Sequence, residues 1–584
     1  MIYAVVSLEE LDAAIDYSKL IFSDSETDGL YGRIVMLQVM QAGWDKALLV
    51  RDPERFKLMA MLNKNTVWHN AHYDLTCVQT MLKMPWIPKH FEDTFLLARI
   101  ALPHMESYTL DSLLSEVLGF DPYKNEGLDK KLLQKSNWSG TLSEQQKLYA
   151  ALDVYHMPEV WDKISVAIED TNYQLDIATV ITCLEIQNNG MPIDQDLLEI
   201  KLNESIIELD ANPVPINVNS WQQVRKWLDV TKSDDKALSI LQLAPDVGCL
   251  ESSEKGIKAG RIRKRRKLLK LINFLEKYNA CGDYLYGKLK PSARSGRLTS
   301  DNDNIQQIPR ALKGVFGYSP HSGRVIIYAD YAQLELRTIA AILNVLLMVK
   351  MFRQGVDVHS FTAQMLFGEN FTSLHRLYSK GANFGLLYGG GVDMFIGFMM
   401  QIASVVLSQR EASSIKTRWS NLWKEITKWQ QEGIAKWRKG KLGSTPLGRH
   451  YKAKMMTDFL NIENQGAGAD VSKLAGHYMN TKSIPMLRKK HGLSKTDIRL
   501  CNIIHDSFII DCIDNKEVYE EAAYEMAKCM QIAWFEISKS FKIKDVPMPV
   551  DVRVGYNWGQ IDSDDGFKLY QYEMEGLECL GVDL

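Results

Sequence analysis

The stretch RLYSKGANFGLLYGGG, residues 376–391, places Arg376, Lys380, Phe384 and Tyr388 at a constant spacing of four residues. Each step of four advances about 40° beyond a full helical turn, so the spacing predicts that all four side chains lie along one slowly winding stripe of a helix. Two cations followed by two aromatic rings suit a ligand with a phosphate end and a sugar-and-base end. Two solvated cations beside two core rings would give the same pattern, so the interpretation depends on the segments that surround this stretch.

Two aspartates stand at the ends of apolar runs that are typical of buried strands. Asp330 follows the run VIIY at residues 325–328, and the sequence QLELRTIAAILNVLL after it is helix-like. In CNIIHDSFIIDC, apolar residues flank His505, Asp506 and Ser507, which predicts a tight hairpin that presents Asp506. Carboxylates suit hard cations such as Mg²⁺, and two of them together could hold two ions for in-line phosphoryl transfer. Each aspartate alone would also fit a turn or a helix cap.

A second set of carboxylates begins near the N-terminus. In LIFSDSETDGL, Asp24 and Glu26 alternate after an apolar run, so both side chains face the same side of a predicted strand. Further apolar stretches at residues 34–39 and 47–50 predict an opening of three antiparallel strands.

The segments WHNAHYD and YAALD add Asp74, Tyr149 and Asp153 to this set. Tyr149 and Asp153 are four residues apart and therefore share a helix face. Four carboxylates and a tyrosine could hold two metal ions and orient a water molecule for phosphodiester hydrolysis.

The three C-terminal segments resemble motifs A, B and C of the family A DNA polymerases, the bacterial DNA polymerase I type, in the same order and with similar spacing. The resemblance implies that Asp330 and Asp506 bind two catalytic Mg²⁺ ions, with the backbone carbonyl of Tyr331 as a further ligand and Mn²⁺ as a substitute metal. It implies that Arg376 and Lys380 bind the triphosphate, and it makes them, with the two aspartates, the expected catalytic residues. The residues expected to bind the nucleotide are Gln333, Glu335, His359, Arg376, Lys380, Phe384 and Tyr388.

The resemblance also gives several of these residues separate tasks. Glu335 is expected to exclude a 2′-hydroxyl group, and His359, in GVDVHSFTAQMLFG, to touch the phosphates. Phe384 is expected to pack on the sugar and Tyr388 to check the nascent base pair.

Other segments resemble the DNA-contacting parts of the same family. SGRLTSDNDNIQQIPR supplies a minor-groove arginine, and NIENQGAGAD supplies contacts to template and primer. The minor groove barely distinguishes base pairs, which suits an enzyme that accepts any sequence. Residues 255–270, KGIKAGRIRKRRKLLK, hold nine Lys or Arg in sixteen positions and predict salt-sensitive backbone contacts, although a basic run is usually a solvated face. The expected DNA-binding residues are Arg297, Asn461, Gln465, His505, Arg263, Lys264 and Arg266.

The N-terminal set resembles the DEDDy 3′–5′ proofreading exonucleases. That resemblance implies metal binding by Asp24, Glu26, Asp74 and Asp153 and a catalytic Tyr149 that positions the attacking water. The expected fold is α/β and multidomain: an RNase H-like exonuclease domain followed by a right-hand polymerase. The predicted boundaries are exonuclease 1–170, thumb 171–290, first part of the palm 291–345, fingers with the return to the palm 346–480, and second part of the palm 481–584.

Composition narrows the remaining possibilities. The chain has 584 residues, enough for several cores, and its net charge of −3 means that any surface for nucleic acid is local. Its eight cysteines form no CxxC pair, which argues against a zinc site or a disulfide framework. The N-terminus lacks the pattern of a signal peptide, so we expect a cytoplasmic monomer, in the host cytoplasm if the protein is viral, with no membrane contact.

The compact layout, with no 5′-nuclease domain expected ahead of the exonuclease, resembles that of bacteriophage replicative enzymes. The expected partners are primer–template DNA, dNTPs, and a replisome helicase, primase or single-strand-binding protein. Two rival hypotheses stay open: a nuclease whose C-terminal module only binds DNA, and a non-catalytic replication scaffold. A polymerase that copies RNA or bypasses lesions is a variant of the main hypothesis.

Three positions depart from the family pattern or vary within it. Ser507 stands where the family usually has glutamate, so one carboxylate near the metal ions is missing. Gly381 inside the predicted helix is expected to cost about 1 kcal/mol relative to alanine and to loosen closure of the fingers. Phe384 occupies a position that holds phenylalanine or tyrosine in the family, and it predicts discrimination against dideoxynucleotides.

Overall fold

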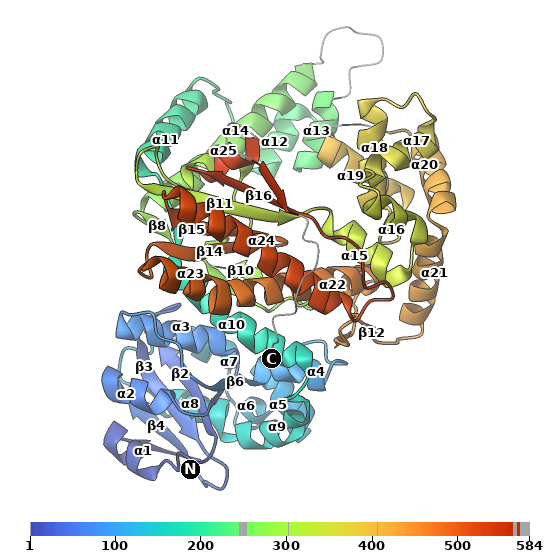
Figure 1. Cartoon of the computed structure of the whole chain (residues 1–584). Helices are drawn as coiled ribbons and strands as arrows, with labels where there is room; N and C mark the ends of the chain where they lie inside the picture. Colours follow the sequence, from blue (N-terminus) through green and yellow to red (C-terminus); the bar gives the residue numbers. More distant parts are fainter. Residues whose placement is uncertain are drawn as a thin grey trace.

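A computed structural model of the chain describes residues 2–243, 254–301, 303–403, 405, 407–563 and 569–572. Figure 1 shows an N-terminal module, drawn in blue, below a larger C-terminal module. The predicted thumb range includes residues 244–253, and the predicted second part of the palm includes residues 573–584. Both stretches lie outside the described residues.

A six-stranded sheet forms the centre of the N-terminal module, in the order β1-β4-β3-β2-β5-β6. Strands β2, β3 and β4 are antiparallel, as the sequence predicts, and β5 and β6 then run parallel to β2. The strands are β1 (Tyr3–Val6), β2 (Ile21–Thr27), β3 (Ile34–Met40), β4 (Ala47–Arg51), β5 (Thr66–Trp68) and β6 (Phe91–Asp93).

Helices pack around this sheet and cover β3, whose seven residues are all buried. They are α1 (Leu8–Ala14), α2 (Arg55–Leu62), α3 (Ala71–Leu82), α4 (Thr94–Ala101), α5 (Leu110–Leu118), α6 (Pro122–Asn125), α7 (Lys130–Gln134), α8 (Glu144–Tyr155) and α9 (Met157–Ile164).

Helix α10 (Thr171–Asn189) joins the two modules. Leu175, Cys183 and Ile186 on this helix belong to the C-terminal core, whereas Tyr173 and Leu184 belong to the N-terminal core. Since burial of apolar surface is the main favourable term in packing, a helix that contributes side chains to both cores holds the two modules together.

A second sheet, in the order β14-β15-β11-β16-β17, lies at the centre of the C-terminal module. Its strands are β11 (Arg324–Tyr331), β14 (Ile498–Ile504), β15 (Ser507–Ile513), β16 (Val550–Gly555) and β17 (Leu569–Tyr572). Shorter paired strands are β7 (Met191–Pro192), β8 (Tyr284–Leu285), β9 (Lys288–Lys290), β10 (Thr299–Asp301), β12 (Gly443–Ser444) and β13 (His450–Tyr451).

Three groups of helices surround this sheet in Figure 1. The first, at the top, comprises α11 (Gln195–Asp210), α12 (Trp221–Leu228), α13 (Asp235–Leu243) and α14 (Glu254–Asn279). The second, on the right, comprises α16 (Leu346–Arg353), α17 (Val358–Phe367), α18 (Ser373–Gly385), α19 (Val392–Ala403), α20 (Gln409–Leu422) and α21 (Lys424–Arg438). Against the sheet lie α15 (Leu334–Leu343), α22 (Met456–Tyr478), α23 (Ile484–His491), α24 (Lys516–Ser538) and α25 (Trp558–Ser563).

Two helix predictions are corrected by the structure. The helix-like run after Asp330 is broken at Asn344, whose φ of +62° ends α15 before α16 begins. Helix α18 ends at Gly385, so Tyr388 lies in the following turn and not on the same helical stripe as Arg376, Lys380 and Phe384. Gly389, with a φ of +79°, turns the chain there toward α19. No helix of the described residues is long and apolar enough to cross a membrane.

Candidate active sites

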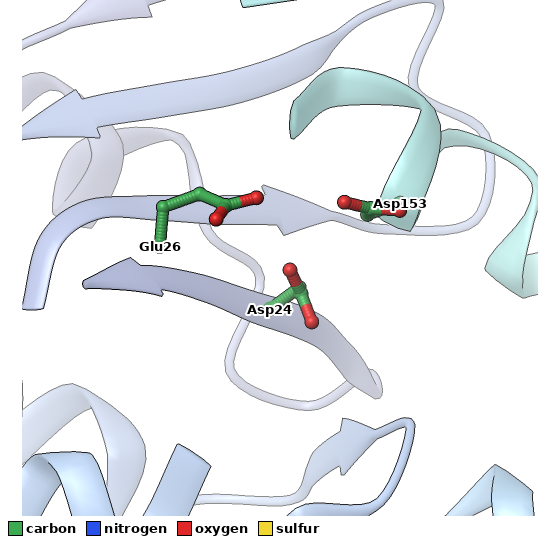
Figure 2. Close-up of side chains that lie close together, drawn as sticks. All are labelled: Asp24, Glu26 and Asp153. Carbon is green, nitrogen blue, oxygen red and sulfur yellow. The ribbon is translucent and has the colours of Figure 1, made fainter. Parts of the chain in front are cut away.

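The N-terminal site is built where β2 faces α8. Asp24 and Glu26 alternate along β2, and Asp153 projects toward them from α8 (Figure 2). One carboxylate oxygen from each of these three residues lies within 4.8 Å of the other two. Like charges at this separation repel, so the arrangement suits a cation bound between them.

The other predicted residues of this set lie in the same pocket, of about 790 Å³. Asp74, on α3, accepts a hydrogen bond of 2.6 Å from the hydroxyl of Ser25, and it stands outside the group of three carboxylates. Tyr149 is buried on α8, and its pKa is raised by burial and by the charges of Asp153, Glu26 and Asp24. The structure therefore brings all five predicted residues together.

The carboxylates of this pocket are difficult to ionise without a counter-charge. Burial, followed by the neighbouring carboxylates, raises the pKa of Asp24 and of Glu26 well above the usual range. Burial raises the pKa of Asp74 to about 7 and that of Asp153 to about 6. Each shift comes first from burial, which disfavours the charged carboxylate, and a divalent cation bound among these oxygens would offset that cost.

The sequence pattern did not indicate two further residues at the N-terminal site, Lys130 in the pocket lining and Tyr123 next to Asp153. The hydroxyl of Tyr123 donates a short hydrogen bond to Asp153. The ammonium of Lys130 lies over the Tyr123 ring, binds Asp111 at 2.9 Å, and opposes the rise in the pKa of Asp153. Neither residue has a conspicuous spacing to the predicted carboxylates, so only the fold reveals them.

The C-terminal site lies at one end of the central sheet. Strand β11 carries Asp330, and β14 and β15 form the predicted tight hairpin. Its loop has two residues, His505, with a φ of +59°, and Asp506. Asp330 pairs with Ser507 across the sheet, which places it one position from Asp506. On its other side Asp330 pairs with Asp551 of β16, a neighbour that the sequence pattern did not indicate.

One carboxylate oxygen of Asp330 is left without a hydrogen-bond donor among the described residues. Its buried Oδ1 has no hydrogen-bond partner there, and burial, with the charges of Asp506 and Asp551, raises its pKa to about 8. Burial also raises the pKa of Asp506 to about 6. The unsatisfied oxygen and the clustered acids suit a bound cation, since hard metal ions prefer carboxylate oxygens.

A pocket of about 300 Å³ adjoins Asp506. Arg297 and Glu335 form an ion pair of 3.0 Å in its wall. Asn464 donates hydrogen bonds to the hydroxyl of Tyr388 and to the backbone carbonyl of Glu335. Among the predicted residues, the lining includes Arg297, Gln333, Glu335, Phe384, Gln465, His505 and Asp506. Asn464 also lines it, whereas Asn461, about one turn earlier on α22, does not.

The cations of α18 have different surroundings. Arg376 pairs with Asp357 at 2.9 Å, and Lys380 is exposed. His359 is nearly fully buried; its Nδ1 lies 3.0 Å from Asn383 Nδ2, and its ring lies 5.6 Å from that of Phe384. In this conformation His359 therefore packs behind Phe384, and its predicted contact with phosphates requires a rearrangement.

Gly381 has a packing role that the sequence did not indicate. A Cβ built on Gly381 would lie 2.0 Å from Sδ of the buried Met399, so the glycine lets α18 and α19 approach closely. We expect Gly381→Ala to lower the free energy of unfolding by about 1 kcal/mol, because overpacking costs about 1–3 kcal/mol and the gain in helix propensity is about 1 kcal/mol. Urea unfolding measures this change. In a Met399→Ala background, which removes the clashing sulfur, Gly381→Ala should cost less than it does in the unaltered protein. A more stable single variant would contradict the packing role.

The basic run on α14 makes several contacts inside its own module, and its DNA contacts stay a prediction. Arg266 donates to the carbonyls of Val218 and Ser233, Arg263 pairs with Asp235 at 2.9 Å, and Lys264 pairs with Glu208 at 2.8 Å. Such contacts tie α14 to α11 and to the segment around α12 and α13. Residues 255–270 contain no acidic side chain, so the acidic partners of this run come from other segments of the chain.

Two family models match this chain, one over each module. The family model "DNA polymerase family A" matches residues 194–560, and the model "3′–5′ exonuclease" matches residues 2–169. DNA polymerase I of Aquifex aeolicus is 27% identical over 93% of this chain and 96% of its own length. A thermostable DNA polymerase I of Thermus thermophilus is 23% identical over 68% of this chain and 47% of its own.

Among solved structures, the POL domain of Pol1 from M. smegmatis, in complex with DNA primer-template and dNTP, superposes with a TM-score of 0.68. It is 18% identical, and the match covers 92% of this chain and 95% of that one, which shows a shared fold. The predicted order, an exonuclease domain ahead of a polymerase domain, is confirmed by these matches.

Proposed function

Since the chain belongs to DNA polymerase family A and carries a 3′–5′ exonuclease domain, it is a template-directed DNA polymerase with a proofreading module, and we propose that Asp330 and Asp506 form its extension site. The observation that carries this assignment is the pairing of β11 with the β14–β15 hairpin, which sets Asp330 one position from Asp506. Asp506 lines the pocket of Arg297, Glu335 and Phe384, whereas Asp330 lines a separate pocket with Asp551. Primer–template DNA and an incoming dNTP are the substrates that this site would take.

Both acidic sites fit divalent metal ions, and we propose Mg²⁺ at each, with Mn²⁺ as a substitute. Asp330, Asp506 and the backbone carbonyl of Tyr331 would hold the ions in the C-terminal site. Asp24, Glu26, Asp74 and Asp153 would hold them in the N-terminal site. When bound, the metal ions would supply an activated oxygen nucleophile and neutralise charge on the reacting phosphate.

The residues around the extension site would bind and orient the nucleotide. Arg376 and Lys380 would receive the phosphates, with Arg376 exchanging its pairing to Asp357 for the ligand. Phe384 would support the sugar, and Glu335, held by Arg297, would block a 2′-hydroxyl group. Tyr388, oriented by Asn464, would test the shape of the base pair. Positioning and electrostatics would then supply most of the acceleration.

In the N-terminal site Tyr149 would orient the water that attacks the primer's terminal phosphodiester. Its position beside Asp153, Glu26 and Asp24 supports this role. The Tyr123 hydroxyl, bonded to Asp153, would keep that carboxylate aimed into the pocket.

Extension of a labelled primer on a DNA template with Mg²⁺, with and without dNTPs, tests both assignments. Growth with dNTPs and shortening without them are expected. Shortening alone would favour a nuclease whose C-terminal module only binds DNA, and neither activity would favour a replication scaffold.

We expect Phe384→Tyr to relax discrimination against dideoxynucleotides. Phe384 lines the nucleotide pocket. The phenolic hydroxyl of a tyrosine at this position would supply a hydrogen bond in place of the one that a dideoxynucleotide loses with its 3′-hydroxyl group. A gain of about tenfold corresponds to 1.4 kcal/mol, the scale of one hydrogen bond. Competition between ddNTP and dNTP in single-nucleotide extension measures it. Phe384→Leu is the control without a hydroxyl, and unchanged ddNTP use by the tyrosine variant would contradict the assignment.

The domain boundaries proposed from the sequence stand as proposals: exonuclease 1–170, thumb 171–290, first part of the palm 291–345, fingers with the return to the palm 346–480, and second part of the palm 481–584. We also propose, from the sequence alone, that the protein is a cytoplasmic monomer that works with a helicase, a primase or a single-strand-binding protein. A bacteriophage origin rests only on the compact layout. The Aquifex relative matches over 96% of its own length, so that layout also occurs in a bacterial protein.

A further inference from the structure

One β-hairpin of the C-terminal module reaches both candidate sites. The 288–301 hairpin consists of β9, β10 and the loop between them. Lys290 and Ser292 line the exonuclease pocket, whereas Arg297 lines the nucleotide pocket and pairs there with Glu335. A shift of this hairpin would therefore alter the walls of both pockets together.

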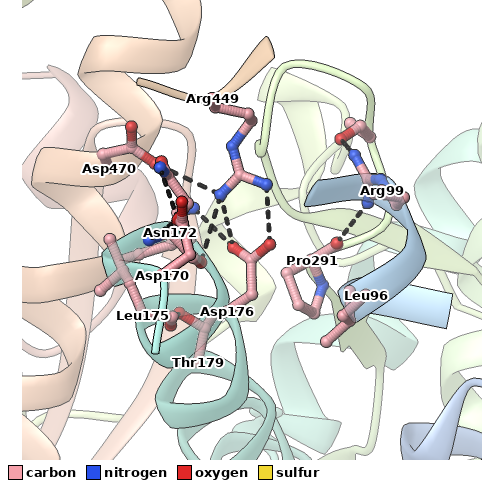
Figure 3. Close-up of polar contacts among 12 residues, drawn as sticks. Leu96, Arg99, Asp170, Asn172, Leu175, Asp176, Thr179, Pro291, Arg449 and Asp470 are labelled. Atoms are coloured by element: carbon pink, nitrogen blue, oxygen red, sulfur yellow. Dashed lines mark hydrogen bonds and ion pairs between the residues drawn. The ribbon is translucent and has the colours of Figure 1, made fainter. Parts of the chain in front are cut away.

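The exonuclease domain contacts the strands of this hairpin through Tyr31, which donates to Asp301 at 3.0 Å, and contacts the loop through main-chain carbonyls. Arg99, on α4, is buried and donates hydrogen bonds to the carbonyls of Pro291, at 3.0 Å, and Ala293 (Figure 3). In the opposite direction, Arg294 of the hairpin donates to the carbonyl of Glu106 in the exonuclease domain and to that of Lys452. Bonds to main-chain carbonyls fix where the loop lies without depending on its side chains.

A buried ionic network of Arg449, Lys473, Asp176 and Asp470 packs against the same loop. Arg449 donates to Asp176 of α10 through its two terminal guanidinium nitrogens, at 2.8 and 2.9 Å (Figure 3). Lys473 binds Asp176 and Asp470 at 2.8 Å each. Both acids are fully buried, and both cations nearly so. A buried charge is tolerated only when it is paired, so this network has little freedom to move.

The network and the loop meet at Gly296. A Cβ built there would lie 3.2 Å from Lys473 Nζ and 3.4 Å from Arg449 Nε, and Gly296 has a φ of +80°. The backbone of Gly296, which precedes Arg297, therefore packs directly against the side chains of Lys473 and Arg449. Arg99 holds the start of the loop and the network holds its end.

We propose that Arg99 is a positioning residue through which the exonuclease domain sets the place of Arg297, and that this contact helps to decide which site the primer terminus occupies. The proposal rests on the proposed function of the two sites. With Arg99 in place, the loop presents Arg297 to a paired primer, and the paired end stays in the extension site. Without it, the loop can shift, Arg297 binds the primer less well, and the end spends more time in the exonuclease pocket.

Arg99→Met tests this, because Arg99 has carbonyl oxygens as its hydrogen-bonding partners and its removal strands no buried acid. Arg51→Met is a matched control, since Arg51 also donates to two carbonyls, those of Trp138 and Ser139, but within the exonuclease domain. For Arg99→Met we expect the ratio of dNMP released to dNTP incorporated on a paired primer to rise about fivefold, the effect of losing one ordinary hydrogen bond. The KM for primer–template should rise with kcat little changed, and hydrolysis of a free single strand should stay as in the unaltered enzyme.

A double-mutant cycle separates positioning from general weakening. If Arg99 acts through Arg297, Arg99→Met should add little to the dNMP ratio of Arg297→Met. An additive effect, an unchanged ratio, or an equal loss of single-strand hydrolysis would overturn the proposal. If Arg99→Met does not fold, Arg294→Met, which removes exposed contacts of the same loop, takes its place with the same expectations. The Arg297→Met single variant tests the proposed DNA contact separately, because an unchanged KM there would refute that contact whatever Arg99 does.

Discussion

Asp330→Asn is expected to abolish primer extension while 3′–5′ hydrolysis and DNA binding remain. The substitution keeps the size of the side chain but removes the charge that would hold metal ions, and Asp330 belongs to the C-terminal sheet, away from the N-terminal carboxylates. Bound metal contributes several kcal/mol of transition-state stabilisation, and a loss of about 4 kcal/mol lowers the rate by about 10³-fold. Single-turnover extension with saturating dNTP measures the change.

The control for Asp330→Asn is Asp545→Asn, an exposed aspartate of the same module that pairs with Arg353. It should retain extension. Loss of both activities in Asp330→Asn would indicate a folding defect, which thermal melting would reveal. Extension at the unaltered rate would show that Asp330 is a structural strand-end residue and would refute the metal assignment.

The residues predicted best from the sequence are those whose chemistry depends on local pattern. Asp24 and Glu26 alternate on one strand, and Asp506 sits in a hairpin flanked by apolar residues; both patterns determine the direction of the side chain without knowledge of the fold. Asp330 at the end of β11 belongs to the same class. Local sequence patterns were therefore enough to predict where these four carboxylates point.

Residues whose role depends on distant partners escaped prediction. Asp551 is next to Asp330 only because β16 pairs with β11, about two hundred residues apart in sequence. The sequence also does not show that Arg266 donates to the carbonyls of Val218 and Ser233, which lie more than thirty residues before it. Tyr388 lies off its predicted stripe because α18 ends at Gly385, although the spacing of four continues.

Asp24→Ala is expected to abolish 3′–5′ hydrolysis while extension continues at nearly the unaltered rate. Asp24 belongs to the group of three carboxylates, and its pKa is raised by burial and by the other acids, as expected of a site that requires a bound cation. Removing a metal ligand should cost at least as much as the several kcal/mol that the metal supplies, about 10³-fold or more in rate. Release of labelled dNMP from a single strand measures the loss.

The same variant should also change how the enzyme behaves at a mismatch. With hydrolysis removed, a primer with a mispaired end should persist and be extended slowly, whereas the unaltered enzyme should trim it first. Asp12→Ala, an exposed acid of the same module whose removal leaves the pocket intact, is the control and should trim normally. Because Asp74 and Asp153 remain in Asp24→Ala, residual trimming restored by Mn²⁺ would still support a metal site. Trimming at the full rate in Mg²⁺ would show instead that the three clustered carboxylates do not carry the hydrolysis.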